Sequence, residues 1–121
     1  MILEVLNQEM EKLNINYSFM RYTEAIPRYP YFVSSYVENE YSEEEQKTTG
    51  TITISGWSRN SLLELIEVKD VLKRHFNQFS VVKDGYTVVV HYDNGTAIDS
   101  GEAELYKIII RLSFKEWKGE D

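Results

Sequence analysis

Apolar and polar positions along this chain follow two different periods, and the changes between them predict an order of helices and strands. Leucine and methionine recur at helical spacing across residues 3–13, which predicts a short amphipathic helix whose glutamates, including Glu9, lie largely off the apolar stripe. Alternation across residues 15–19 predicts a strand. Pro27 and Pro30 then exclude regular pairing until an extended segment begins. The apolar stripe of the first helix is therefore expected to cover a sheet.

Two further strands are predicted around an acidic stretch. Residues 31–37 are mostly aromatic or β-branched, and residues 51–57 alternate strictly. In the second of these strands Ile52 and Ile54 point to one face, while Trp57 shares the other face with threonine and serine side chains. The intervening glutamate-rich stretch is expected to form a long loop at the tip of a protruding β-hairpin.

A second amphipathic helix is predicted to begin close to Ser61. Ser61 and Glu64 have the spacing of a capping box, in which each side chain satisfies a backbone N–H at the start of a helix. Apolar residues from Leu62 through Leu72 to Phe79 then mark a broad apolar face, which is expected to pack on the sheet.

The remaining sequence predicts a β-hairpin and a final strand. Asp84-Gly85 lies between two valine-rich runs, which is typical of a two-residue turn. Asp93-Asn94-Gly95 predicts the end of that strand and an irregular stretch, before residues 106–115 alternate again. This order predicts a single α+β domain over residues 1–121, with an antiparallel or mixed sheet, two main helices packed on one face and a long protruding β-hairpin.

Composition narrows the possible functions. With 121 residues, of which 42% are hydrophobic, the chain is long enough to bury a core without disulfides or metals. It has no cysteine, which excludes disulfides and a thiolate nucleophile. A net charge of −7 disfavours binding to a phosphate backbone, so no direct sequence-specific nucleic-acid binding is expected. Neither a basic N-terminal flank nor a long apolar run signals secretion or membrane insertion, and folding in a cytoplasm is expected.

Candidate catalytic and metal-binding groups are few. His75 and His91 have no accompanying motif and are expected to be packed or boundary histidines. Asp93, Asp99 and Glu102 do not have the spacing of a calcium-binding loop. The sequence therefore predicts a protein without enzymatic activity, cofactor or metal.

A contact surface for another protein is predicted instead. Tyrosines flank the glutamate run and offer large amphipathic contact area, and tryptophan is a frequent anchor at subunit interfaces. The alternatives are a solvated loop tip for the glutamates and the edge of the core for Trp57. The expected contact residues are Tyr36, Tyr41, Glu43, Glu44, Glu45, Trp57 and Arg59.

A family resemblance accompanies these features. The chain has Pro30-Tyr31-Phe32-Val33 after its first helix, and then a long hairpin and Gly56-Trp57-Ser58-Arg59 before an amphipathic helix. In this it resembles the small tail terminator and head–tail joining proteins of long-tailed bacteriophages and prophages. The resemblance runs from the first helix to the last strand. It implies a homo-oligomeric ring, hexameric in that family, at the end of the tail.

The resemblance also implies partners and a location. The ring would contact phage tail-tube and head-connector proteins. The protein would be found in the bacterial cytoplasm during assembly and then in the tail or neck of the virion. A rival interpretation is a monomeric acidic binding module, of the inhibitor or immunity type, which presents its carboxylates to a basic enzyme.

Overall fold

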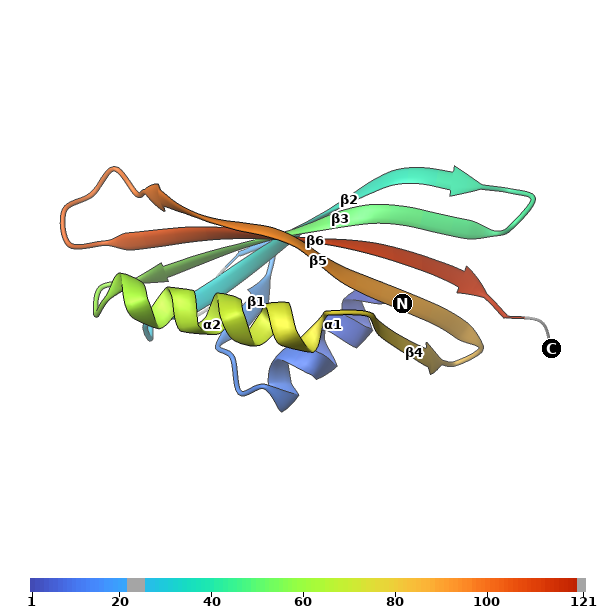
Figure 1. Ribbon diagram of the computed structural model, residues 1–121, viewed down its shortest axis with the longest axis horizontal. Coiled ribbons are helices and arrows are strands. Elements are labelled where there is room, and N and C mark those ends of the chain that lie inside the picture. Colours follow the sequence, from blue (N-terminus) through green and yellow to red (C-terminus); the bar gives the residue numbers. More distant parts are fainter. Residues whose placement is uncertain (22–25, 120–121) are drawn as a thin grey trace.

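The computed structural model describes residues 1–21 and 26–119. Both helices lie on the same side of one six-stranded sheet (Figure 1). The sheet has the strand order β1-β2-β3-β6-β5-β4, in which only β1 and β2 pair in parallel. The predicted α+β class, with two helices on one face of a mixed sheet, is confirmed. The elements are α1 (Ile2–Lys12), β1 (Tyr17–Phe19), β2 (Tyr31–Ser42), β3 (Lys47–Ser58), α2 (Leu62–His75), β4 (Phe79–Lys83), β5 (Tyr86–Asp99) and β6 (Tyr106–Lys118).

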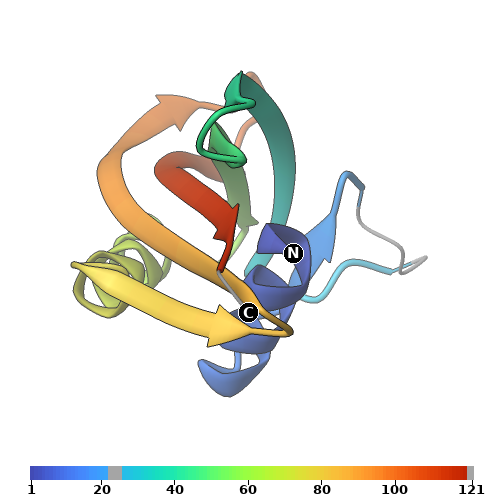
Figure 2. The ribbon, with the colours of Figure 1, turned by 90° about the vertical axis from the view of Figure 1, so that its right-hand side faces the viewer.

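The core lies between the two helices and the inner face of the sheet. Viewed along the long axis of Figure 1, the sheet curls around this core (Figure 2). Burying each large apolar side chain contributes about 1.5 to 3 kcal/mol. The core side chains are Ile2, Val5, Leu6, Met10, Phe32, Ile52, Ile54, Leu65, Leu72, Phe76, Val88, Val90, Ile108, Ile110, Leu112 and Phe114.

Hydrogen bonds fix the start of α2 to the end of β3. Ser61 caps the helix, because its hydroxyl oxygen accepts a hydrogen bond from the backbone N–H of Glu64 at 3.1 Å, as predicted. The other half of the predicted capping box is wrong: the backbone N–H of Ser61 donates to Oγ of Ser58 at 3.5 Å and not to the carboxylate of Glu64. The carboxylate of Glu64 accepts a hydrogen bond from the buried hydroxyl of Ser58 at 2.7 Å. The last residue of β3 therefore sets where α2 begins and how it leaves the sheet.

The first helix is held at both ends of its buried face. The backbone N–H of Ile2 donates to Oε2 of Glu116 in β6 at 2.9 Å, so a carboxylate from the sheet caps the helix N-terminus. The expectation that Glu9 lies off the packed face is wrong: this residue is 6% exposed and contacts His75 of α2. A helix covered by both a sheet and a second helix buries more than its apolar stripe.

The acidic stretch between β2 and β3 is mostly strand. Pairing continues to Ser42 and Lys47, with a bulge at Asn39, so only residues 43–46 form the turn. The prediction of a long loop is therefore wrong, because the connection between the two strands is only four residues. β3 is also paired with β6 from Lys47 to Ser58, so the protruding hairpin is not confirmed as a separate arm.

The fifth strand is longer than its sequence indicated. Asp84-Gly85 forms the predicted two-residue turn, with φ of 51° and 81°. The expected end of the strand at Asp93 is wrong, because β5 continues to Asp99 through a bulge between Tyr92 and Asn94. Asp93 occupies that bulge, and its Oδ1 accepts a hydrogen bond from the hydroxyl of Ser113 at 2.9 Å.

Candidate functional site

The predicted contact residues fall into two groups at opposite ends of β3. Tyr36, Tyr41 and the three glutamates lie toward the turn at residues 43–46, whereas Trp57 and Arg59 lie where β3 ends. Trp57 is ten positions beyond Lys47 on β3, which is roughly 33 Å at the rise of a strand. In Figure 1 the turn is at the right and the end of β3 at the left. The two groups are therefore separate parts of the surface.

The first group is centred on the acidic turn, which we define as Glu43, Glu44 and Glu45. All three are exposed. Glu45 forms an ion pair with Lys47 at 3.7 Å, and within the described part of the chain Glu43 and Glu44 form none. Tyr41 beside them is 54% exposed. The turn therefore presents two uncompensated carboxylates and an accessible aromatic ring.

Tyr36 belongs to the core side of the sheet. Its ring stacks on Phe114 of β6, with centroids 5.6 Å apart and planes inclined by 23°. Burial raises the pKa of the Tyr36 hydroxyl, and the carboxylates of Glu38 and Glu116 raise it further. The structure thus places Tyr36 against the core and not beside the exposed glutamates.

The second group extends into an aromatic–cation cluster, defined as Tyr29, Tyr31, Trp57, Arg59 and Lys107. The rings of Tyr31 and Trp57 stack at 5.1 Å, and Tyr29 lies 5.5 Å from Tyr31. Nζ of Lys107 is 5.1 Å from the Trp57 ring centroid. The guanidinium of Arg59 lies 5.9 Å from the Tyr29 ring. Trp57 is half-buried because these neighbours cover it, and neither interpretation based on the sequence alone included Lys107 or Tyr29.

Arg59 also joins two loops. Its NH2 atom lies 2.7 Å from Oε1 of Glu102, which belongs to the β5–β6 loop. This hydrogen bond raises the pKa of the Arg59 side chain. In the same loop Oδ1 of Asp99 accepts a hydrogen bond from the backbone N–H of Gly101 at 2.8 Å. Asp99 and Glu102 therefore stabilise the conformation of the β5–β6 loop and its contact with Arg59.

The face of the sheet opposite the helices is open. On β3 the buried residues alternate with Thr49, Thr51, Thr53, Ser55 and Trp57, which all point to this open face. On β6 the residues between Ile108, Ile110, Leu112 and Phe114 point the same way. Neither helix covers this side (Figure 1). The open face therefore carries hydroxyl groups, and the aromatic–cation cluster lies at one end of this face.

A row of cations runs along the open face. Lys107, Arg111 and Lys115 are spaced four residues apart on β6; we call them the cation row. Their cross-strand neighbours are all uncharged: Trp57, Thr53 and Thr49 on β3, and Ile98, Asn94 and Val89 on β5. In the described residues none of the three forms an ion pair with a carboxylate. The strict alternation of residues 106–115 in the sequence was the signal that could have revealed this row.

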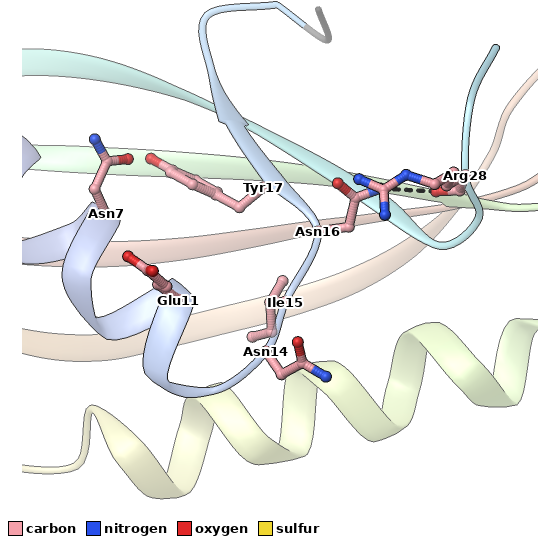
Figure 3. Close-up of a pocket in the computed structure, with 7 residues that line it drawn as sticks. All are labelled: Asn7, Glu11, Asn14, Ile15, Asn16, Tyr17 and Arg28. Atoms are coloured by element: carbon pink, nitrogen blue, oxygen red, sulfur yellow. Dashed lines mark hydrogen bonds between the residues drawn. The ribbon is translucent and has the colours of Figure 1, made fainter. Parts of the chain in front are cut away.

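A separate polar hollow lies beside α1. It has a volume of about 650 Å³, and three of its seven lining residues carry amide side chains (Figure 3). Nδ2 of Asn16 donates to the backbone oxygen of Arg28 at 2.8 Å. The hydroxyl of Tyr17 lies 2.5 Å from Oγ of Ser34, and burial raises the pKa of the Tyr17 phenol. The lining residues are Asn7, Glu11, Asn14, Ile15, Asn16, Tyr17 and Arg28, which include no serine, cysteine or histidine to act as a nucleophile or base.

Two structural observations concern metals and membranes. Across residues 1–21 and 26–119, no three histidine, aspartate or glutamate side chains lie close enough together to hold a metal ion. Neither described helix has the length and apolar character that crossing a membrane requires. His91 is exposed on β5, and His75 contacts Glu9.

Comparison with known proteins adds no family assignment. The sequence matches no protein-family model, and it shows no significant similarity to a curated protein.

Proposed function

We propose that this chain is a non-enzymatic structural protein of a phage or prophage virion, a tail terminator or head–tail joining subunit. Copies of the chain form a ring at the end of the tail and contact the tail tube and the head connector. The protein is made in the bacterial cytoplasm and ends in the tail or neck of the virion. The resemblance of residues 30–33 and 56–59 to that family supports this proposal.

The observation that carries the proposal is the amount of sheet left open. β1 pairs with β2 only at residues 32–34, and no described strand pairs with the outer edge of β2 at residues 35–42. β4 pairs with β5 only at residues 86–90, and the backbone N–H of Tyr92 donates to the backbone oxygen of Phe76 at 3.2 Å. Beyond that bond no described strand pairs with the outer edge of residues 93–99. Together with the open face, these edges give one subunit several different surfaces for contact.

Different surfaces on one subunit are what a ring requires. A contact between two unlike patches is heterologous, and repetition of such a contact gives a ring when its rotation closes and an open filament when it does not. The two open edges lie on opposite sides of the sheet, because β1 and β4 are its terminal strands. A subunit can therefore contact one neighbour through the open edge of β2 and another through the open edge of β5, which are different surfaces.

The test is complementation of a phage that lacks this gene. The wild-type chain is expected to restore tails of normal length that join to heads, and infectious particles with them. A variant with Glu43, Glu44 and Glu45 all replaced by lysine is expected to remain folded and to leave tails incomplete, because like charges then meet at the contact. Thermal melts of both proteins provide the control for folding.

The result that would contradict the proposal is a phage that assembles normally without the chain. Normal, correctly ended tails with the triple lysine variant alone would remove the acidic turn from the mechanism and leave the ring in place. These two outcomes are separable, because the first concerns the gene and the second concerns one surface of its product.

The acidic turn also supports the rival function, a monomeric inhibitor or immunity-type module. Its uncompensated carboxylates suit a basic enzyme as well as a neighbouring subunit. The neighbourhood of the gene discriminates between the two. Flanking genes for capsid, portal and tail-tube proteins favour the ring, and an adjacent toxin gene favours the inhibitor.

A further inference from the structure

The cation row on the open face forms no ion pair with the described residues of its own chain. Arg111 and Lys115 are exposed, and Lys107 is half-buried against Trp57. Opposite charges on paired strands stabilise a sheet, yet the direct partners of these three cations on both neighbouring strands are uncharged. NH1 of Arg111 donates to Oδ1 of Asn94 at 3.4 Å, and the carboxylate of Asp93 in the β5 bulge borders the row through its hydrogen bond from Ser113, but neither makes an ion pair with the row in the described residues. The chain as a whole has a net charge of −7, so a group of three cations on one face is a local reversal of its charge.

The acidic turn has the complementary charge and lies beyond one end of the row. Ser42 and Lys47 are still paired strand residues, and Glu44 and Glu45 border a hollow with Trp117 and Lys118 at the end of β6 in the same chain. Arg111 and Lys107 pair with Thr53 and Trp57, six and ten positions along β3 from Lys47, which is roughly 20 and 33 Å at the rise of a strand. Folding the turn back to these two cations would break the pairing of β2 and β3, so a contact of the turn with Arg111 or Lys107 must join two molecules.

We infer that the open face docks the acidic turn of a second copy of this chain, with the carboxylates of the turn placed against the cation row. The contact is heterologous, since the turn of one copy meets the sheet face of the next. It rests on the self-association in the proposed function and specifies which surfaces make it. The hydroxyl groups of Thr49, Thr51 and Thr53 beside the row supply additional hydrogen-bond donors for the incoming carboxylates.

Reversal of charge on each side tests this contact. One variant carries Glu43→Lys and Glu44→Lys, a second carries Arg111→Glu and Lys115→Glu, and a third carries all four substitutions. Sedimentation equilibrium of the purified full chain measures the dissociation constant of self-association. Each one-sided reversal is expected to raise that constant at least about tenfold, and the fourfold variant is expected to restore most of the loss, because opposite charges then face each other again.

A matched control uses cations elsewhere on the surface. Lys73 and Arg74 are exposed on α2, and Lys73→Glu with Arg74→Glu changes the net charge by the same amount as the reversal on β6. This control is expected to leave self-association unchanged. Circular dichroism and thermal melts of every variant separate loss of contact from loss of fold.

Three results would overturn the inference. The first is self-association that is unaffected by both one-sided reversals, and the second is failure of the fourfold variant to recover. The third is binding of a short duplex DNA that is lost in the β6 reversal while self-association is kept, which would assign the row to DNA. If the purified wild-type chain is monomeric, the same variants are compared with it by tail complementation. Equal yields of infectious particles from the wild type and all variants would also overturn the proposed contact.

The outcomes distinguish this inference from the proposed function. Tails that require the chain but tolerate the reversals would retain the virion role and reject this contact. A chain that associates through these surfaces but is absent from purified virions would retain the contact and reject the virion role.

Discussion

Nε2 of His75 lies 2.8 Å from Oε1 of Glu9, so a carboxylate of α1 meets an imidazole of α2 at the edge of the core. Nζ of Lys12 lies 3.0 Å from the other carboxylate oxygen. Burial by itself raises the pKa of Glu9, but the hydrogen bonds from Lys12 and His75, together with their charges, lower it below its ordinary value of 4.5. The pair connects the two helices on the same face of the sheet.

The lowered pKa of Glu9 predicts a pH-dependent contribution to stability. A carboxylate with a lowered pKa in the folded state stabilises fully above its ordinary pKa of 4.5, and that stabilisation is lost as the pH falls through the lowered value. Glu9→Gln is therefore expected to reduce the free energy of unfolding by about 1.5 to 3 kcal/mol at neutral pH. Urea unfolding between neutral and acidic pH should show this difference shrink below pH 4.5.

Glu11→Gln is the matched control for that series, since Glu11 is an exposed residue of the same helix. It is expected to change stability by less than about 0.5 kcal/mol. A Glu9→Gln difference that persists unchanged into acid would show that the ionised carboxylate is not what stabilises the contact.

The apolar pattern of the second helix predicts that Leu72 lies in the core. The structure confirms this, because the Leu72 side chain is fully buried. Leu72→Ala is expected to cost about 2 to 5 kcal/mol through lost burial and a residual cavity. Leu63 on the same helix is 63% exposed, so Leu63→Ala should cost far less. Glu44→Ala in the acidic turn should barely change the melting temperature. Melts that rank these variants differently would contradict the packing of α2.

Gly56 has a steric role in the core. It is buried opposite Phe32, and a methyl group added at Gly56 would lie within 2.5 Å of Cδ1 of Phe32. Gly56→Ala is therefore expected to cost about 1 to 3 kcal/mol by overpacking. Combining it with Phe32→Leu should cost less than the sum of the two single substitutions. Ser55→Ala, on the open face of the same strand, is the control, and additive effects of the pair would argue against a clash.

The stacked rings of Tyr31 and Trp57 predict a measurable coupling. The two residues are direct partners across β2 and β3, with centroids 5.1 Å apart. A double-mutant cycle with Tyr31→Ala and Trp57→Ala is expected to give a coupling of about 0.5 to 1.5 kcal/mol in chemical unfolding. No coupling would mean that Trp57 is held by Lys107 and the sheet alone.

The fold could be predicted largely from local pattern. Helical spacing and the cap at Ser61 located both helices, and alternation located the strands, because these signals need only neighbouring residues. Two errors have a common cause: the acidic stretch and Asp93-Asn94-Gly95 contain residues typical of turns, but bulges at Asn39 and after Tyr92 let the strands continue. The acidic stretch continues because β2 pairs with β3 as far as Ser42 and Lys47, and residues 94–99 continue because they pair with β6. Strand pairing of this kind depends on the partner strand, which the local pattern of residues does not show.

The candidate site was less predictable for the same reason. Exposure of the glutamates follows from their charge, so the acidic turn was identified from sequence. The neighbours of Trp57 come from β2 and β6, and the sequence does not show that Tyr31 and Lys107 lie beside it. Glu9 and His75, 66 residues apart, could be paired only after the helices were placed.

Cryo-electron microscopy of virions from the phage or prophage that encodes this chain would show whether its copies form the proposed ring at the end of the tail. We expect a closed ring of copies of this chain between tail tube and head connector, with the acidic turn of each copy on the sheet of the next. Complete, infectious virions in which neither the density nor mass spectrometry contains this chain would contradict it.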